Sequence, residues 1–159
     1  MDLTFSACCL SDAEKIFRIV NRLNYDYQEI KVNKDYVLYS DLEEVRDDII
    51  DGNYVIVEYD NFPIGCVKYK IYEMNGLLGC YLGPLVVIPE YQYAGVESEI
   101  LNYIIDQAKI NRCDNITIDI INTMPDLISV YKQLGFCEVA IEPYLHYDNV
   151  FVIKLCKKI

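Results

Sequence analysis

The sequence predicts a mixed α/β (α+β) fold in which a central sheet of about seven strands is flanked by four helices. Helical spacing of apolar residues alternates with β-branched runs along the whole chain, in the order strand, two helices, three strands, helix, strand, helix, two strands. The 159 residues are 53% hydrophobic, which is enough for the core of one domain. No linker or repeat interrupts them, so residues 1–159 are expected to form a single domain.

The first part of this order is a short strand at residues 3–5 followed by two helices. Ser11 and Glu14 form the pattern of a capping box before a run of apolar residues at helical spacing. The same pattern at Ser40 and Glu43 predicts the start of a second helix, which Gly52 is placed to end.

Three strands are expected next. Residues 54–59 and 64–72 predict a hairpin in which Lys68 and Lys70 lie on the face opposite the apolar residues. Asn75-Gly76 is the clearest tight-turn signal in the chain. Cys80 to Ile88 is apolar on both faces, which predicts a central strand covered on both sides. The remaining elements are expected as a helix after Gly95, a strand at 116–121, a helix from Pro125 to Leu134, and strands at 136–141 and 150–155.

Acidic residues dominate the charge of the chain. There are 25 acidic and 14 basic residues, and residues 26–60 hold eleven carboxylates and three cations, which is −8 of the net −11. Such a surface repels phosphate backbones and anionic lipid, so neither nucleic acid nor a membrane is expected as a partner, and a cationic partner is favoured. Residues 24–39 are polar, acidic and rich in tyrosine, and they are the first candidate for a substrate-facing loop.

The seven cysteines are scattered and odd in number, which predicts free thiols in a reducing, cytoplasmic compartment. Only Cys8 and Cys9 are close together, and adjacent thiolates rarely share a tetrahedral site, so no metal is expected. The first residues lack the basic start and apolar stretch of a secretory signal. No apolar run approaches the roughly 18 residues that a membrane helix needs.

The most informative segment runs from Leu82 to Glu97. A buried strand ends at Pro89, and a short loop containing Gly95 opens a helix. Backbone amides in such a loop converge on one point, and the helix dipole adds partial positive charge there, which makes a phosphate site without basic side chains. Taken alone, a plain turn from strand to helix is the simpler explanation.

Val87-Ile88-Pro89 and Gln92-Tyr93-Ala94-Gly95-Val96 resemble, in register, the acetyl-CoA-binding motif of the GCN5-related N-acetyltransferase (GNAT) superfamily. That motif is Gln/Arg-x-x-Gly-x-Gly/Ala after a strand that ends in Val-x-Pro. Ile118-Asp119-Ile120 and Tyr131-Lys132-Gln133-Leu134-Gly135-Phe136 are similar to the family's downstream segments. The resemblance implies the GNAT fold, with a mostly antiparallel sheet whose fourth and fifth strands splay apart.

The resemblance also implies acetyl-CoA as co-substrate and direct attack of a primary amine on the thioester. The pantetheine arm would pair with the fourth strand, where a backbone amide near Val86–Val87 would stabilise the oxyanion. The loop from Gln92 to Ser98 would hold the diphosphate. A homodimer could form through the C-terminal strands or a sheet edge. The cofactor-binding residues implied in this way are Leu85, Val86, Val87, Gln92, Tyr93, Ala94, Gly95, Val96, Ser98 and Asn122.

Tyr131 matches the family's general acid, which protonates the departing CoA thiolate, and the alternative is a core tyrosine on a helix face. Tyr81 stands where many members place a glutamate. A tyrosine with an unperturbed pKa of about 10 is a poor base near neutrality, but it could anchor a water chain. No base is assigned, and the alternatives are Glu58, Glu90, Asp119 and His146.

Three departures from the family pattern bear on cofactor binding. Glu97 stands where glycine or alanine is usual, Tyr93 and Ala94 replace frequent cations, and Met124 falls where asparagine is common, although Asn122 lies two residues upstream. The motif and the acidic, tyrosine-rich residues 24–60 favour a first hypothesis, an N-acetyltransferase for a cationic amine, such as a polyamine, an amino sugar, or a lysine or amino-terminal amine of a protein. The departures instead motivate a second hypothesis, a GNAT-fold binding or regulatory module with impaired acetyl-CoA binding and no catalysis.

Overall fold

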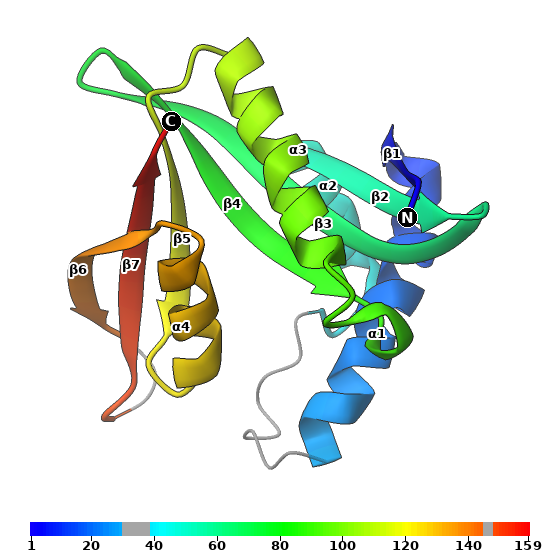
Figure 1. Ribbon diagram of the computed structural model, residues 1–159. Coiled ribbons are helices and arrows are strands. Elements are labelled where there is room, and N and C mark those ends of the chain that lie inside the picture. The colour runs from blue at the N-terminus through cyan, green and yellow to red at the C-terminus, as the bar shows by residue number, and fades with distance from the viewer. Residues whose placement is uncertain (30–38, 145–147) are drawn as a thin grey trace. The chain divides into compact units, whose positions relative to one another are not determined.

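The computed structural model describes residues 1–29, 39–144 and 148–159, and for residues 23–29 it describes the backbone alone. These residues form seven strands and four α-helices (Figure 1). The strands are β1 (Leu3–Ala7), β2 (Asn53–Tyr59), β3 (Phe62–Met74), β4 (Leu77–Val87), β5 (Asn115–Ile121), β6 (Cys137–Pro143) and β7 (Phe151–Lys158). The helices are α1 (Ala13–Glu29), α2 (Leu42–Asp51), α3 (Val96–Ile110) and α4 (Pro125–Gln133).

The strands form one sheet in the order β1-β2-β3-β4-β5-β7-β6. The pairs β1/β2, β2/β3, β5/β7 and β6/β7 are antiparallel, whereas β4 and β5 are parallel. The parallel register covers only Gly79–Tyr81 against Asn115–Thr117, although β4 continues to Val87 and β5 to Ile121. The predicted fold class, a mixed and mostly antiparallel sheet with four helices, is confirmed.

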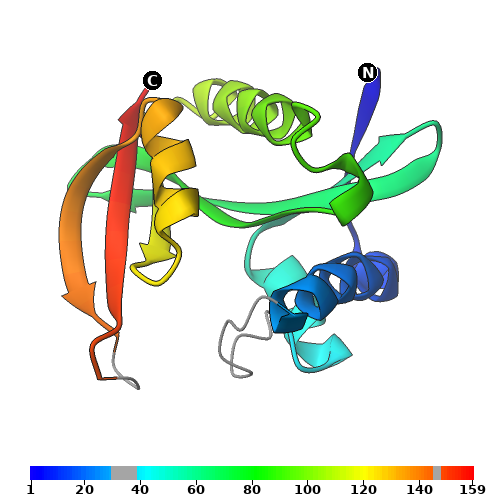
Figure 2. The same ribbon diagram turned by 60° about the horizontal axis from the view of Figure 1, so that its bottom comes forward.

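The chain divides into two compact units. The first comprises Met1–Lys70 and Pro84–Ile104. In it, α1 and α2 cover one face of β2 and β3, and the first turns of α3 cover the other (Figure 2). The rings of Phe5 and Tyr103 stack with their centroids 4.4 Å apart, which ties β1 to α3. The centre of this core is fully buried and aliphatic, with Ile16, Val20, Val45, Val55, Ile64 and Ile100.

The second unit comprises Ile71–Gly83 and Ile105–Ile159. Its core is built on Ile116 of β5 and Leu155 of β7, both fully buried. Strand β6 forms one edge of the sheet, and its apolar Val139 and Ile141 are more than half exposed. The register of β6 against β7 shifts between Glu138 and Ala140.

The predicted capping box at Ser11 and Glu14 is wrong by two residues. The backbone amide of Cys9 donates to Asp12 Oδ2 at 3.0 Å, and a 3₁₀ turn at Leu10–Asp12 leads directly into α1. The Asp12 carboxylate, and not that of Glu14, accepts from a free backbone amide, because the chain already turns at Leu10. Glu14 instead pairs with Arg18 one turn along α1.

The second box is displaced by one residue. Asp41, not Ser40, is the N-cap of α2, and its Oδ1 accepts from the amide of Glu44 at 3.0 Å. The Glu44 carboxylate in turn accepts from the Ser40 amide at 2.7 Å. The carboxylate of Asp41 is a stronger acceptor than the hydroxyl of Ser40. Its negative charge is also favourable next to the positive end of the helix dipole.

One further expectation about the first unit is corrected. Helix α1 continues to Glu29, so the first residues of the proposed loop at 24–39 are helical. Residues 30–38 lie outside the described residues, and Tyr39 is buried with its hydroxyl donating to Asp48 at 2.5 Å. The lysine face of β3 is covered by α2, so that Lys68 is only 9% exposed. The tight turn at Asn75-Gly76 is confirmed, because both residues have positive φ, and Asp60 and Asn61 also have positive φ where the predicted hairpin of 54–59 and 64–72 turns.

Candidate functional site

A sharp turn joins β4 to α3 and contains Gln92, Tyr93, Ala94 and Gly95, four of the residues that the sequence singles out. After Val87 the amide of Ile88 donates to Ile64 O at 2.8 Å, and a single 3₁₀ turn follows at Pro89–Tyr91. Tyr93 and Gly95 then both adopt left-handed backbone, with φ of 61° and 87°. Alternation between left-handed and ordinary conformations turns successive amides toward one side, as in an anion-binding nest.

The space in front of this turn is open. A Cβ added to Gly95 would meet no atom within 4 Å, so this glycine supplies its left-handed conformation and also leaves the backbone uncovered. The 15-residue helix α3 begins at Val96, and its free amides and dipole favour an anion at this end. No lysine or arginine occurs between Lys70 and Lys109, so the turn itself attracts an anion only through its backbone.

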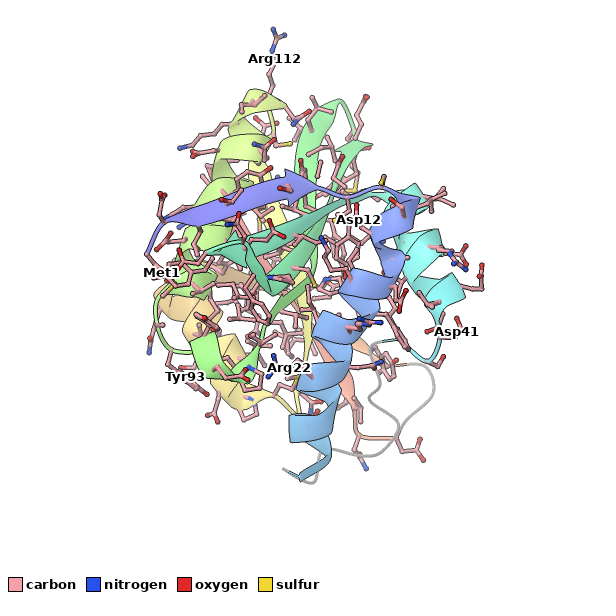
Figure 3. The ribbon with its side chains drawn as sticks, turned by 90° about the vertical axis from the view of Figure 1, so that its right-hand side faces the viewer. Met1, Asp12, Arg22, Asp41, Tyr93 and Arg112 are labelled. Carbon is pink, nitrogen blue, oxygen red and sulfur yellow. The ribbon has the colours of Figure 1, made fainter. Side chains whose placement is uncertain are left out.

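Side chains also hold the turn. Gln92 Nε2 donates to Val87 O at 2.9 Å. Glu90 forms an ion pair with Arg22 of α1, and the ring of Tyr91 packs edge-on against Tyr59 of β2, with centroids 6.0 Å apart. Tyr93 is 98% exposed at the outside of the turn, toward which Arg22 extends from α1 (Figure 3).

The end of β4 lies directly against β3. Val86 and Val87 are buried and Leu85 is half-buried. A Cβ on Gly65 of β3 would come within 2.6 Å of Val86 O, so only glycine fits there. Ala94 in the turn is exposed. In the first turn of α3 Val96 is fully buried, Glu97 is half-buried and Ser98 is exposed.

The other predicted residues belong to the second unit. Tyr131 is buried near the C-terminus of α4, with its ring edge-on to Phe136 at 5.4 Å. Tyr81 of β4 is 37% exposed, and burial together with the nearby Asp119 raises the pKa of its phenol. Asn122 Oδ1 accepts from the amide of Phe151 at 2.9 Å, so this side-chain oxygen binds β5 to β7.

The structure thus brings Leu85, Val86, Val87 and residues 92–98 together in the first unit and places Tyr81, Asn122 and Tyr131 in the second. Of the alternative bases, Glu58 pairs with Lys15 at 3.8 Å. A hydrogen bond from its own backbone amide, together with Arg22, lowers the pKa of Glu90. His146 lies outside the described residues. Sequence reasoning missed Arg22 and Gly65, although a lone glycine in a strand pattern is a signal for close backbone approach.

An open cleft of about 970 Å³ adjoins the turn within the first unit. Its walls come from one face of α1, the start of α2 and the first residues after β4, including Phe17, Asn21, Arg22, Leu42, Pro89 and Glu90. Both apolar and charged side chains line it.

Metal and membrane features were sought in the described ranges. Residues 1–29, 39–144 and 148–159 contain no group of three His, Cys, Asp or Glu side chains arranged to hold a metal ion. In the same part of the chain, no helix combines the length and apolar character needed to cross a bilayer. All seven cysteines are free thiols; Cys66, Cys80 and Cys113 are buried, whereas Cys9 and Cys137 are exposed.

Comparison with known proteins gives a family and a set of similar folds. The model of the Acetyltransferase (GNAT) family matches residues 17–136. The ribosomal-protein-S18-alanine N-acetyltransferase from Escherichia coli has a similar structure, with 14% identity over 99% of this chain and 94% of its own and a TM-score of 0.76.

Two similar structures contain the cofactor or an analogue. A GNAT family acetyltransferase from Elizabethkingia anophelis with acetyl-CoA bound is 16% identical over 99% of this chain and 98% of its own, with a TM-score of 0.68. Naa50 from Arabidopsis thaliana, in complex with the bisubstrate analogue CoA-Ac-MVNAL, is 18% identical over 100% of both chains, with a TM-score of 0.73. No curated protein sequence matches this chain significantly.

Proposed function

Because this chain belongs to the acetyltransferase (GNAT) family, we propose that it is an N-acetyltransferase that moves an acetyl group from acetyl-CoA to a primary amine. The observation that carries the proposal is the turn between β4 and α3. It combines left-handed Tyr93 and Gly95, an uncovered backbone and the N-terminus of a 15-residue helix. These features fit a diphosphate, which the amides of a loop and a helix N-terminus bind without cationic side chains.

In this proposal the thioester arm lies along Leu85, Val86 and Val87, whose backbone amides would stabilise the oxyanion that forms when the amine attacks. Residues 92–96 and Ser98 form the rim of the diphosphate site. Asn122 follows β5 and is proposed to contribute through its side-chain NH₂, since its oxygen is bonded to Phe151.

Tyr131 is proposed as the general acid, because a phenol can give its proton to the departing thiolate. Tyr81 has a different role, since its raised pKa keeps the phenol protonated at neutral pH. In that form it donates a hydrogen bond and can position a water molecule, but it cannot take the proton of the amine. The amine therefore loses its proton to another acceptor.

We propose a cationic amine as the acceptor, on the basis of the acidic residues between 26 and 60. Part of this charge is already neutralised in the structure, because Asp48 and Asp51 bind Lys68 and Arg46 binds Glu43. The remaining attraction is assigned to Asp26, Glu29 and Asp35, of which Asp26 and Glu29 belong to α1. The side chains of all three lie outside the described residues.

The substrate proposal is tested with the triple variant Asp26→Asn, Glu29→Gln, Asp35→Asn and a panel of amines. Loss of three carboxylates should raise KM for polyamines and leave KM for acetyl-CoA unchanged. An unchanged amine profile would contradict the cationic acceptor and leave the acetyl-CoA site intact as a proposal.

The cofactor proposal is tested by thermal unfolding with acetyl-CoA, with free CoA as the control. At a ligand concentration of 100 times Kd, binding stabilises the folded state by about 2.7 kcal/mol. For a chain of this size that raises Tm by roughly 5–10 °C. No dose-dependent rise at millimolar ligand would refute the proposed cofactor site.

One observation favours a second candidate, a GNAT-fold binding module without catalysis. Glu97 places a half-buried carboxylate in the first turn of α3, where it would repel a diphosphate. The variant Glu97→Gly separates the two candidates. If only the variant gains stability from acetyl-CoA, the natural protein is the non-catalytic module.

A further inference from the structure

Backbone hydrogen bonds within the turn that follows β4 stabilise its path only weakly. The 3₁₀ turn at Pro89–Tyr91 has two hydrogen bonds, from Tyr91 N to Ile88 O at 3.0 Å and from Gln92 N to Pro89 O at 3.3 Å. Such single turns have poor hydrogen-bond geometry. Tyr93 follows in a left-handed conformation that residues with a Cβ adopt reluctantly. Something outside the local backbone must therefore hold this path.

The side chain of Gln92 closes the turn. Its Nε2 reaches back over five residues to the carbonyl oxygen of Val87, the last residue of β4, at 2.9 Å. The bond joins Val87, where the turn begins, to Gln92, which directly precedes left-handed Tyr93. It is partly buried, so water competes for it less than at an exposed bond.

We propose that Gln92 is a positioning residue, whose side-chain amide holds Val87 O and thereby fixes the turn that presents the amides of residues 93–96 to the diphosphate. The identity of the ligand in this inference rests on the proposed function, whereas the bond from Gln92 to Val87 O is seen in the structure. It differs from the direct contact that the sequence motif implies, because the Nε2 donor is directed at the protein backbone. The ion pair of Glu90 with Arg22 holds the middle of the same turn.

The two roles of Gln92 differ in the protein without ligand. A residue that only contacts the diphosphate leaves the free turn unchanged when it is replaced. A positioning residue loosens the turn before any ligand is added, so amide hydrogen exchange of the ligand-free protein separates the roles.

The test compares Gln92→Ala with Asn111→Ala by NMR-detected exchange. Asn111 is a matched control, because its Nδ2 also donates to a backbone carbonyl, Gln107 O at 2.8 Å, at the far end of α3. Loss of one hydrogen bond should speed exchange at Tyr91 and at residue 92 about fivefold in the Gln92 variant. Neither variant should change exchange in β5 and β7. Unchanged exchange at Tyr91 in Gln92→Ala would overturn the proposal.

A second variant reports on the bond to Val87 directly. Gln92→Glu keeps the size of the side chain but sets a carboxylate oxygen against Val87 O, so exchange in the turn should be fast at neutral pH. Near pH 4 a glutamate is largely protonated and can donate again, and the difference in exchange from wild type should shrink. A difference that does not depend on pH would overturn the assigned bond.

Acetyl-CoA titration then links the turn to binding. Gln92→Ala should weaken the Kd for acetyl-CoA about fivefold, whereas Asn111→Ala should leave it unchanged. Faster exchange in the turn with an unaltered Kd would overturn the link between the turn and the ligand. If the wild type itself fails to bind acetyl-CoA, the proposed function fails, and the exchange measurements still decide whether Gln92 holds the turn.

Discussion

Lys68 is the most informative single residue for the stability of the first unit. It lies on β3 beneath α2 and is 9% exposed, with its ammonium 2.6 Å from Asp48 Oδ1 and 3.1 Å from Asp51 Oδ2. Lys68→Met keeps the buried stem and removes the charge, which leaves Asp48 without its strongest partner. The hydroxyl of Tyr39 still donates to Asp48 in the variant.

The cost of Lys68→Met follows from the exposure of its partners. A hydrogen bond between charged groups contributes about 1.5–3 kcal/mol, and Asp48 keeps 31% of its side chain in water, which reduces the value to about 1–2 kcal/mol. Urea unfolding should therefore show the midpoint lower by roughly 0.5–1 M. Lys70→Met is the matched control, because Lys70 pairs with Asp51 at 2.7 Å but is 47% exposed. Equal midpoints for wild type and Lys68→Met, or an equal loss in Lys70→Met, would refute the reasoning.

The pH dependence of this difference has a definite sign. Burial alone would lower the pKa of Lys68, but the bonds from its ammonium to Asp48 and Asp51 outweigh burial and raise the pKa above 10.5. A lysine with a raised pKa contributes stability that is full below 10.5 and is lost as pH rises through the folded-state pKa. The difference between wild type and Lys68→Met should be constant from pH 6 to 9 and decline above about pH 10.5.

Three more outcomes are expected. Gly65→Ala should destabilise by about 1–3 kcal/mol, because its Cβ would lie 2.6 Å from Val86 O, and an unchanged Tm would contradict that packing. Tyr131→Phe should lower kcat by a factor of about 10² or more with the Kd for acetyl-CoA unchanged, and undiminished turnover would remove Tyr131 from the mechanism. Burial raises the pKa of the Cys66 thiol to about 12, so alkylation of the native protein followed by mass spectrometry should label the exposed Cys9 and Cys137 before Cys66. Labelling of Cys66 at the same rate would show that this core opens readily.

The sequence predicts well those features that depend on neighbouring residues. The turns at Asp60-Asn61 and Asn75-Gly76 are local, and the segment from Leu85 to Ser98 is continuous, so its pattern is visible without the fold. The second capping box is misplaced because Ser40 has Asp41 beside it, and two adjacent residues can each cap the helix there. The first is misplaced because a 3₁₀ turn with Cys9 as its N-cap precedes α1, so that Asp12 fills the place expected for Glu14.

Features that depend on distant segments could not be predicted. The burial of Lys68 requires α2 to cover β3, and alternation along one strand does not show what lies on its faces. Arg22 reaches Glu90 across 68 positions of sequence. The path by which Gln92 returns to Val87 O is close in sequence, but the motif alone suggests a ligand contact and gives no sign of the bond to the backbone.

The exposed edge strand β6 has a consequence for the protein at high concentration. An unpaired edge can template the addition of strands from other chains, and fibrils grow through flat segments of about six residues. On β6 the register shift between Glu138 and Ala140 and the missing amide hydrogen of Pro143 leave only residues 140–142 as an uninterrupted ladder. Glu138 and Glu142, paired with Lys132 and Lys154, add charge beside the exposed apolar pair. The folded chain therefore carries its own protection against fibrillar aggregation at the edge where its apolar side chains face water.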